Sequence, residues 1–161
     1  MANVWISQLC VDNLLREIEK FSPLETGGSF FGYVGDNGDV VITDLIHAGP
    51  KAKRRRYSFE PDQVFQHAEM ARLFELNGGR TSYLGDWHSH PLSSPELSLR
   101  DERTLLKVAC SADAQCPHPI MMVIGYFPEQ WTINCVRFKH GKKMIWPFFS
   151  CHYETLNVIF D

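Results

Sequence analysis

Apolar residues recur with two different spacings along this chain of 161 residues, and the spacings separate predicted helices from predicted strands. A spacing of three to four residues keeps apolar side chains on one face of a helix and predicts three helices. They cover Cys10–Phe21, Pro61–Asn77 and Leu99–Ala109. Short alternating or continuous apolar runs predict strands over Gly28–Val34, Val40–His47, Ser82–His90, Ile120–Phe127 and Trp131–Lys139. The pattern favours an α/β fold, a sheet flanked by helices.

Glycines and turn residues mark the ends of these elements. The run Gly35-Asp36-Asn37-Gly38 predicts a hairpin turn between the first two strands. Gly78 and Gly79 predict the end of the second helix, whose apolar positions include Val64, Phe65, Ala68, Ala71 and Leu76. Because no linker, repeat or low-complexity segment interrupts the pattern, we expect residues 1–161 to form a single domain.

Composition and charge exclude several classes of function. A net charge of −3 predicts no general affinity for nucleic acid or for an anionic membrane. The longest apolar run, Ile120–Phe127, is too short to span a bilayer, and the N-terminus carries no secretory signal pattern. Five cysteines without paired close spacings argue for a reducing compartment, so we expect a cytoplasmic location.

Two further clusters each leave alternatives open. Lys51–Arg56 places five basic residues in six positions, which predicts either a solvated loop or a docking edge for an acidic partner or substrate tail. Cys110, Cys116 and His118 are a weak candidate for a second metal site, because their spacing is not that of a standard zinc knuckle. Trp87 is expected to lie in the core.

The segment Trp87–Glu102, which reads WHSHPLSSPELSLRDE, carries the most chemical information in the chain. In an extended strand alternate side chains share a face, so His88 and His90 project to the same side. Asp101 lies eleven positions after His90, at the start of a predicted helix, and the intervening loop allows its carboxylate to return to the imidazoles. Three protein ligands with a fourth position left for water are typical of a catalytic zinc site.

The same residues also allow readings without a metal. A His-X-His pair on a strand is often part of a hydrogen-bond network. Ser98 fits the N-cap of the predicted helix, and Asp101, three residues later, lies where an acidic group favours the helix dipole. Capping alone therefore explains these two residues, but it does not explain two histidines in phase just upstream.

The pattern His-X-His-Pro, six further residues and then Ser-X-X-Asp, preceded by Glu25-Thr26-Gly27-Gly28, resembles the JAMM motif of the JAB/MPN metalloproteases. Every polar position of that motif is present and in order, and the surrounding segments are consistent with the family domain through about Phe138. The resemblance implies a single JAB/MPN-like α/β/α domain with a central mixed sheet. It places the metal where the His88 strand meets the helix of Asp101.

The resemblance also implies a reaction and a set of roles. It implies a zinc-dependent peptidase or isopeptidase in which His88, His90 and Asp101 bind Zn²⁺, Glu25 is the general base and Ser98 stabilises the oxyanion. This chemistry is coherent, because zinc lowers the pKa of a coordinated water to about 7 and a nearby carboxylate can accept its proton. If Ser98 is also the N-cap, the two roles compete for one hydroxyl group.

Within the family, the chain looks like the prokaryotic branch, and particularly like the stand-alone peptidases that accompany cGAS-like nucleotidyltransferases in CBASS anti-phage operons. That resemblance implies a protein substrate with an extended C-terminal tail, conjugated through the C-terminus of the nucleotidyltransferase, and a role in antiviral defence. Two alternatives remain open: a JAMM peptidase that processes a sulfur carrier or a small peptide, and a non-catalytic MPN scaffold that binds a partner.

Overall fold

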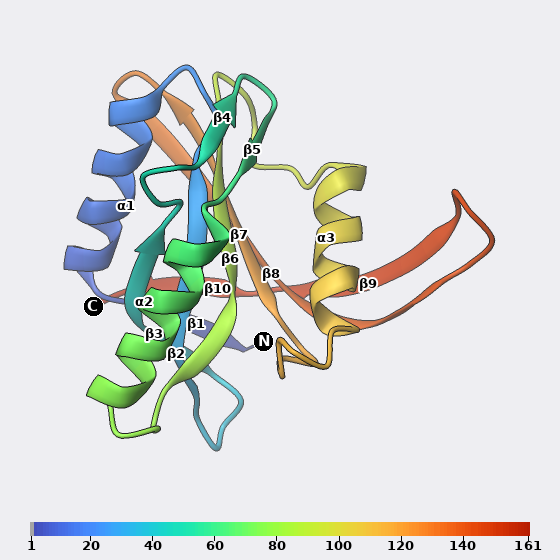
Figure 1. The fold of residues 1–161 in the computed structure, drawn as a ribbon. Helices are drawn as coiled ribbons and strands as arrows, with labels where there is room; N and C mark the ends of the chain where they lie inside the picture. The colour runs from blue at the N-terminus through green and yellow to red at the C-terminus, as the bar shows by residue number, and fades with distance from the viewer. Residues whose placement is uncertain (1) are drawn as a thin grey trace.

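A computed structural model describes residues 2–161 of the chain (Figure 1). The described residues form three helices, α1 (Gln8–Phe21), α2 (Gln63–Leu76) and α3 (Leu99–Ala109). The strands, in chain order, are β1 (Asn3–Ile6), β2 (Gly27–Val34), β3 (Val40–His47), β4 (Lys53–Arg55), β5 (Ser58–Glu60), β6 (Ser82–Pro91), β7 (Ile120–Phe127), β8 (Gln130–Lys143), β9 (Phe149–Thr155) and β10 (Asn157–Phe160).

Eight of the strands form one mixed sheet in the order β10-β1-β3-β2-β6-β7-β8-β9. The pairs β1–β10, β1–β3 and β6–β7 are parallel, and the remaining neighbours are antiparallel. Strands β4 and β5 form a separate two-stranded hairpin. Strand β6 therefore lies near the middle of the large sheet, where neighbouring strands fix the backbone on both sides of His88.

The helices cover both faces of the sheet, as the predicted α/β/α layering requires. On one face α1 buries Leu14 and Ile18 against a cluster that includes Phe30 and Trp87. On the opposite face α2 packs Leu73 on the side of β2 and β3, and α3 packs on the side of β8 and β9. Strand β6 runs between α2 and α3 on that face (Figure 1), so its side chains there are free to line a cleft.

Several expectations from the sequence are confirmed. The bounds of β3, α3 and β7 are those predicted, and β2 and β3 pair antiparallel across the Gly35–Gly38 turn. Trp87 is fully buried, and Gly78 and Gly79 follow α2 with positive φ angles. Helix α1 begins two residues before its predicted start because Ser7 caps it, accepting from the backbone N–H of Cys10.

The backbone of β3 passes very close to Gly28. A Cβ at this position would lie 1.8 Å from the carbonyl oxygen of Ile46 on the neighbouring strand. Because that atom belongs to the backbone, no side-chain rotation can make room for it. Here the glycine is required by packing.

Other expectations were wrong. Val64 and Leu76 of α2 are 81% and 70% exposed, whereas the polar Gln66 is buried beside Leu73. Lys51–Arg56 is not simply a solvated loop, because residues 53–55 form β4 and pair with β5.

No helix among residues 2–161 is long and apolar enough to cross a membrane.

Candidate metal centre

The ends of two adjacent elements bring the predicted ligands together. Strand β6 carries His88 and His90 on one face, and α3 begins at Leu99 with Asp101 in its first turn. The two imidazole Nε2 atoms are 3.1 Å apart, and the Asp101 carboxylate lies 3.2 Å from His88 Nε2 and 3.6 Å from His90 Nε2. Within residues 2–161 these three residues are the one cluster of His, Cys, Asp or Glu side chains with at least three ligand atoms this close together.

The donor set fits a tetrahedral zinc ion. Ligand atoms about 2.0–2.1 Å from zinc at tetrahedral angles lie roughly 3.3 Å from one another, close to the separations among His88, His90 and Asp101. His90 Nδ1 lies 3.1 Å from the carbonyl oxygen of Ser94. A proton on Nδ1 would be donated to this carbonyl, which leaves the Nε2 lone pair free to bind a metal.

Asp101 is fixed by the start of α3. Its Oδ2 atom accepts hydrogen bonds from the Ser98 backbone N–H and from the Ser98 hydroxyl, both at 2.7 Å, while Ser98 Oγ accepts from the Asp101 N–H. This arrangement is a capping box, so the predicted N-cap is confirmed. Burial acts to raise the pKa of Asp101, but hydrogen bonds from His88 and His90 outweigh it, and the pKa falls well below its usual range.

Ser98 therefore shares its hydroxyl with the cap. Its proton is donated to Asp101, and its oxygen accepts from the helix backbone. The capping role is therefore observed, and the hydroxyl would have to turn from Asp101 before it could donate to anything in the cleft.

Glu25 reaches the site because of strand pairing. Gly27, two residues later, is the register partner of His88 in the antiparallel pair of β2 and β6. The loop is tied to β6 by the Thr26 N–H, which donates to Ser89 Oγ, and by the Ser89 N–H, which donates to the Thr26 carbonyl. Burial raises the pKa of the half-buried Glu25 carboxyl, an effect that the nearby His88 and His90 partly oppose. All five predicted residues therefore meet at one place.

This place is one end of a cleft of about 1260 Å³. One wall is formed by α2, with Met70 and Phe74, and the other by α3, with Thr104 and Lys107. The β4–β5 hairpin contributes residues 56–60 to the rim beside the candidate metal ligands. Met70, Ala71 and Phe74 of α2 thus line a cavity of a size that accepts a peptide segment, whereas the exposed Val64 and Leu76 lie outside its lining.

A buried polar network on the cleft floor was missed in the sequence. Asp86 lies on the same face of β6 as His88, and its Oδ1 atom is 3.0 Å from Ser29 Oγ. Ser29 Oγ lies 2.7 Å from Gln66 Oε1, and the Gln66 amide donates to the His47 carbonyl. Burial raises the pKa of Asp86. Asp86 lies two residues before His88, as His88 lies two before His90, so all three share one face of the strand. This alternation could have identified Asp86 from the sequence.

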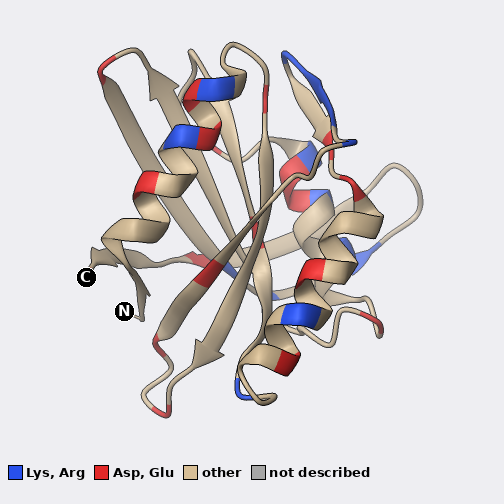
Figure 2. Ribbon diagram, turned by 60° about the vertical axis from the view of Figure 1, so that its left-hand side comes forward, with Lys and Arg blue, Asp and Glu red and all other residues tan. Residues whose placement is uncertain are grey.

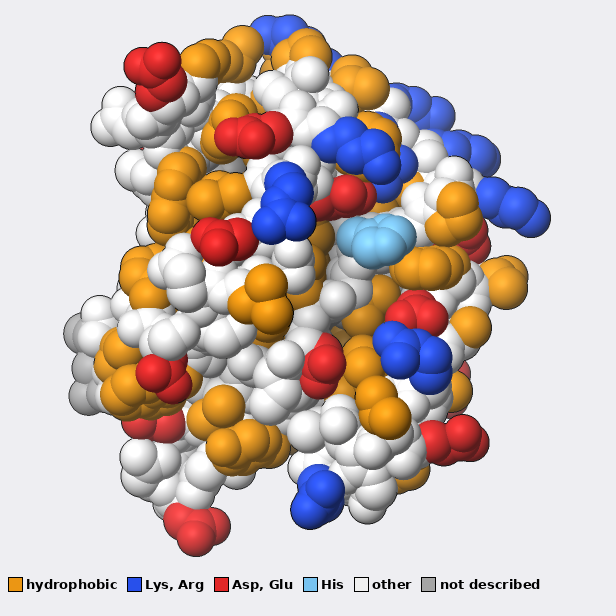
Figure 3. All heavy atoms as spheres, turned by 90° about the vertical axis from the view of Figure 1, so that its left-hand side faces the viewer, with side chains coloured by type: hydrophobic (Ala, Val, Ile, Leu, Met, Phe, Trp, Pro, Cys, Tyr) orange, Lys and Arg blue, Asp and Glu red, His pale blue; other side chains and the backbone are white. Residues whose placement is uncertain are grey.

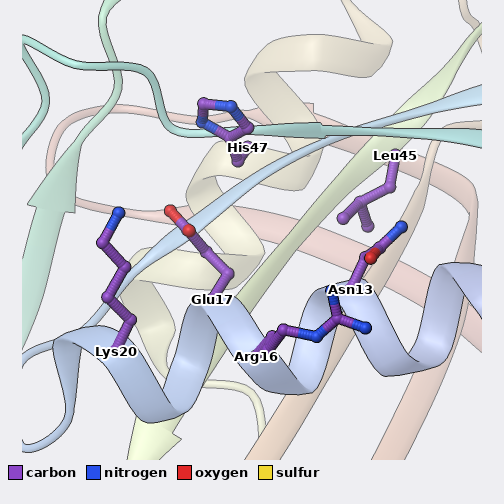
Figure 4. A pocket seen from close by; sticks show the side chains of 6 residues that line it. All are labelled: Asn13, Arg16, Glu17, Lys20, Leu45 and His47. Carbon is purple, nitrogen blue, oxygen red and sulfur yellow. The ribbon is translucent and has the colours of Figure 1, made fainter.

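The other candidate clusters do not form comparable sites. Cys116 Sγ contacts the Leu84 carbonyl and His118 Nδ1 the Phe138 carbonyl, and neither joins a ligand cluster with Cys110 among the described residues. A smaller hollow lies on the α1 face, where acidic and basic side chains are intermixed (Figure 3). In Figure 4 Glu17 of α1 points toward His47 of β3 across this hollow.

A sheet flanked by helices that gathers two imidazoles and a carboxylate in a cleft has the architecture of a metal-dependent hydrolase. Residues 7–138 match the model of the prokaryotic homologs of the JAB domain, and the chain belongs to this family. The chain is an enzyme of the metallopeptidase class, and the resemblance noted from the JAMM motif is confirmed.

Individual relatives agree with this assignment. The chain is 38% identical over 129 residues to a probable metalloprotease, y4qB, of Sinorhizobium fredii, covering 80% of this chain and 79% of that protein. It is 28% identical over 124 residues to a CD-NTase/cGAS isopeptidase of Enterobacter hormaechei, covering 76% of this chain and 67% of the relative. A solution structure of a protein from Desulfitobacterium hafniense shares the fold, with a TM-score of 0.67 at 15% identity over 98% of this chain and 92% of that one.

Proposed function

We propose that this metallopeptidase is a zinc-dependent isopeptidase that hydrolyses the amide bond after the C-terminal tail of a ubiquitin-like or conjugated protein. The observation that carries the proposal is that His88, His90 and Asp101 each place a ligand atom within 4.8 Å of the others, with Glu25 beside them. His88, His90 and Asp101 would hold the ion. Two imidazoles and one carboxylate are a donor set well suited to zinc.

Bound zinc would act as a Lewis acid on the amide carbonyl and would make water acidic enough to lose a proton near neutral pH. Glu25 is placed to hold a proton taken from the attacking water and would pass it to the leaving amine, which is the usual alternation of a single positioned acid–base group. Partial burial raises the pKa of Glu25 and so favours this exchange. Ser98, once its hydroxyl turns from Asp101, donates a hydrogen bond to the oxyanion.

The proposed substrate is a protein with an extended C-terminal tail, and the names of three relatives support a conjugated cGAS-like nucleotidyltransferase. The cleft between α2 and α3 supports a tail in extended conformation, because it continues from the ligands over Asp86 and Met70. Removal of such a conjugate would give the enzyme a role in anti-phage defence. Cys10, Cys110, Cys116, Cys135 and Cys151 are free thiols, which supports the proposed cytoplasmic location.

The test combines metal content with cleavage. Elemental analysis of the purified protein is expected to find about one zinc per chain, and a His88→Ala, His90→Ala double variant is expected to lose it. The substrate is a reporter protein joined by an amide bond to the C-terminal tail of a nucleotidyltransferase. Glu25→Gln should keep the zinc and lower kcat by about a hundredfold or more.

Each result has a defined meaning. A folded native protein that takes up no zinc even on reconstitution would overturn the proposal and favour a non-catalytic scaffold. Native activity that persists in Glu25→Gln would remove Glu25 from the mechanism. Zinc binding with cleavage of a sulfur-carrier tail instead of the nucleotidyltransferase tail would redirect the substrate assignment.

A further inference from the structure

The β4–β5 hairpin separates its cations onto two faces. Alternate side chains of a strand point to opposite sides, so Arg54 points one way while Lys53 and Arg55 point the other. The Arg54 side chain is only 9% exposed, whereas those of Lys53 and Arg55 are 72% and 66% exposed. The basic run found in the sequence therefore has one largely buried cation, Arg54, and several exposed ones.

The inward cation fixes the hairpin to the candidate active site. Arg54 Nε donates to Thr26 Oγ1 at 2.9 Å, and its guanidinium lies 3.2 Å from the Glu17 carboxylate. The Arg55 carbonyl accepts the backbone N–H of Glu25 at 2.8 Å. The hairpin thus holds a fixed position beside Glu25, and its outer face has a defined place relative to the scissile bond.

The outward cations have few counter-charges. Lys53 and Arg55 share a single carboxylate, that of Glu60, at 3.8 and 3.6 Å. The exposed Arg56 donates to the hydroxyl of Tyr57, a neutral group, and Lys51 is exposed as well. Figure 2 shows β4 as a continuous blue segment at the edge of the molecule. Contacts within the hairpin therefore neutralise only part of its positive charge.

Both sides of the cleft near the candidate metal ligands carry cations. Arg56 and Tyr57 line it from the hairpin, and Arg100 and Lys107 line it from α3. Tyr57 is 79% exposed beside Arg56, and aromatic and Arg side chains are the residues most often dominant in protein interfaces. Because the lining also carries carboxylates, Glu60 among them, the basic surface is confined to the hairpin and to single cations of α3, and the hairpin is its largest part.

We propose that the exposed basic residues in and next to the hairpin, Lys51, Lys53, Arg55 and Arg56, form a docking surface for an acidic segment of the protein substrate, next to the bond that is cleaved. This assignment rests on the proposed isopeptidase function. An acidic peptide fits better than nucleic acid, because the basic surface is one short hairpin in a chain with 19 acidic and 16 basic residues. Rim charges of this kind act mainly on encounter rate and salt dependence.

The experiment measures binding separately from catalysis. The probe is a fluorescein-labelled octaglutamate peptide, followed by fluorescence anisotropy against the zinc-loaded full chain at increasing salt. The hairpin variant is Lys53→Glu, Arg55→Glu, Arg56→Glu, which keeps Arg54. The matched control is Arg80→Glu, Lys142→Glu, Lys143→Glu, which changes the net charge equally at exposed positions outside the cleft lining. Circular dichroism checks that both variants fold.

The native protein and the control should bind the peptide, and the hairpin variant should bind it about tenfold more weakly, since each exposed ion pair contributes modestly. Added salt should reduce the difference. Equal affinity of the two variants would overturn the proposal, as would preferential binding of a single-stranded oligothymidylate to the native chain. Zinc content and tail cleavage, measured in parallel, report on the isopeptidase function, so failure of either idea is seen separately.

Discussion

Replacement of Arg54 by alanine should destabilise the protein far more than replacement of its neighbour Arg55. The Arg54 guanidinium lies 3.2 Å from Glu17, whose side chain is 14% exposed, and 3.6 Å from the centre of the Phe21 ring. Without Arg54 the Glu17 carboxylate loses its ion-pair partner. Breaking one side of a buried ion pair costs about 3–5 kcal/mol, a large share of an ordinary stability of roughly 5–15 kcal/mol.

Arg55 supplies the matched control on the same strand. Its ion pair with Glu60 spans 3.6 Å between side chains that are 66% and 52% exposed. Such a pair contributes about 0–1 kcal/mol. The two substitutions remove the same side chain type one residue apart and differ chiefly in burial.

Urea denaturation followed by circular dichroism measures the difference. With a slope of about 1–3 kcal/mol per molar urea, Arg54→Ala should lower the midpoint by about 1 M or more. Arg55→Ala should change it only slightly. A double variant, Arg54→Met with Glu17→Leu, should recover most of the loss, since a buried pair exchanged for apolar groups is often neutral. Equal midpoints for the two alanine variants would refute this reasoning.

Two further predictions concern metal and acid. Zinc at a hundredfold excess over its dissociation constant should stabilise the native protein by about 2.7 kcal/mol, seen as a rise in melting temperature that a chelator reverses and that the His88→Ala, His90→Ala variant lacks. A variant that responds like the native protein would place the ion elsewhere. Hydrogen bonds from the Trp5 indole and from Asn3 lower the pKa of Asp39 to about 2. Because the folded pKa is lowered, this contribution is present above the unfolded value of about 3.9 and is lost as the pH falls through about 2, so Asp39→Asn should flatten the pH dependence of the urea midpoint in that interval. Parallel curves for the two proteins would show that Asp39 does not carry the effect.

The candidate site was predictable because its information is local. His88 and His90 are two residues apart on one strand, and Ser98 and Asp101 three apart at a helix start, so a period and a cap are enough to place them. Only Glu25 required the family motif, since its approach depends on the pairing of β2 with β6. The positions of these residues are as expected, and their roles stay predictions.

What the sequence could not supply is long-range pairing. β1 and β10 are four residues each and come from opposite ends of the chain, so no local period reports that they lie in parallel. β9 was also missed, because its pairing with the extended β8 is set by tertiary contacts. From the sequence, Arg54 is expected to be solvated like its basic neighbours. Its burial could not be predicted, because its partners Glu17 and Phe21 lie more than thirty residues upstream.

The short span from His88 to Asp101 has a practical consequence. An ion bound there would act as a cross-link that closes a small loop between β6 and α3, and closing a small loop restricts few residues. The main core, with Trp87 and Phe30, lies on the other face of the sheet and does not depend on this closure. The apo-protein should therefore stay folded, so that zinc can be exchanged for cobalt and the ligand field read by absorption spectroscopy in an intact enzyme.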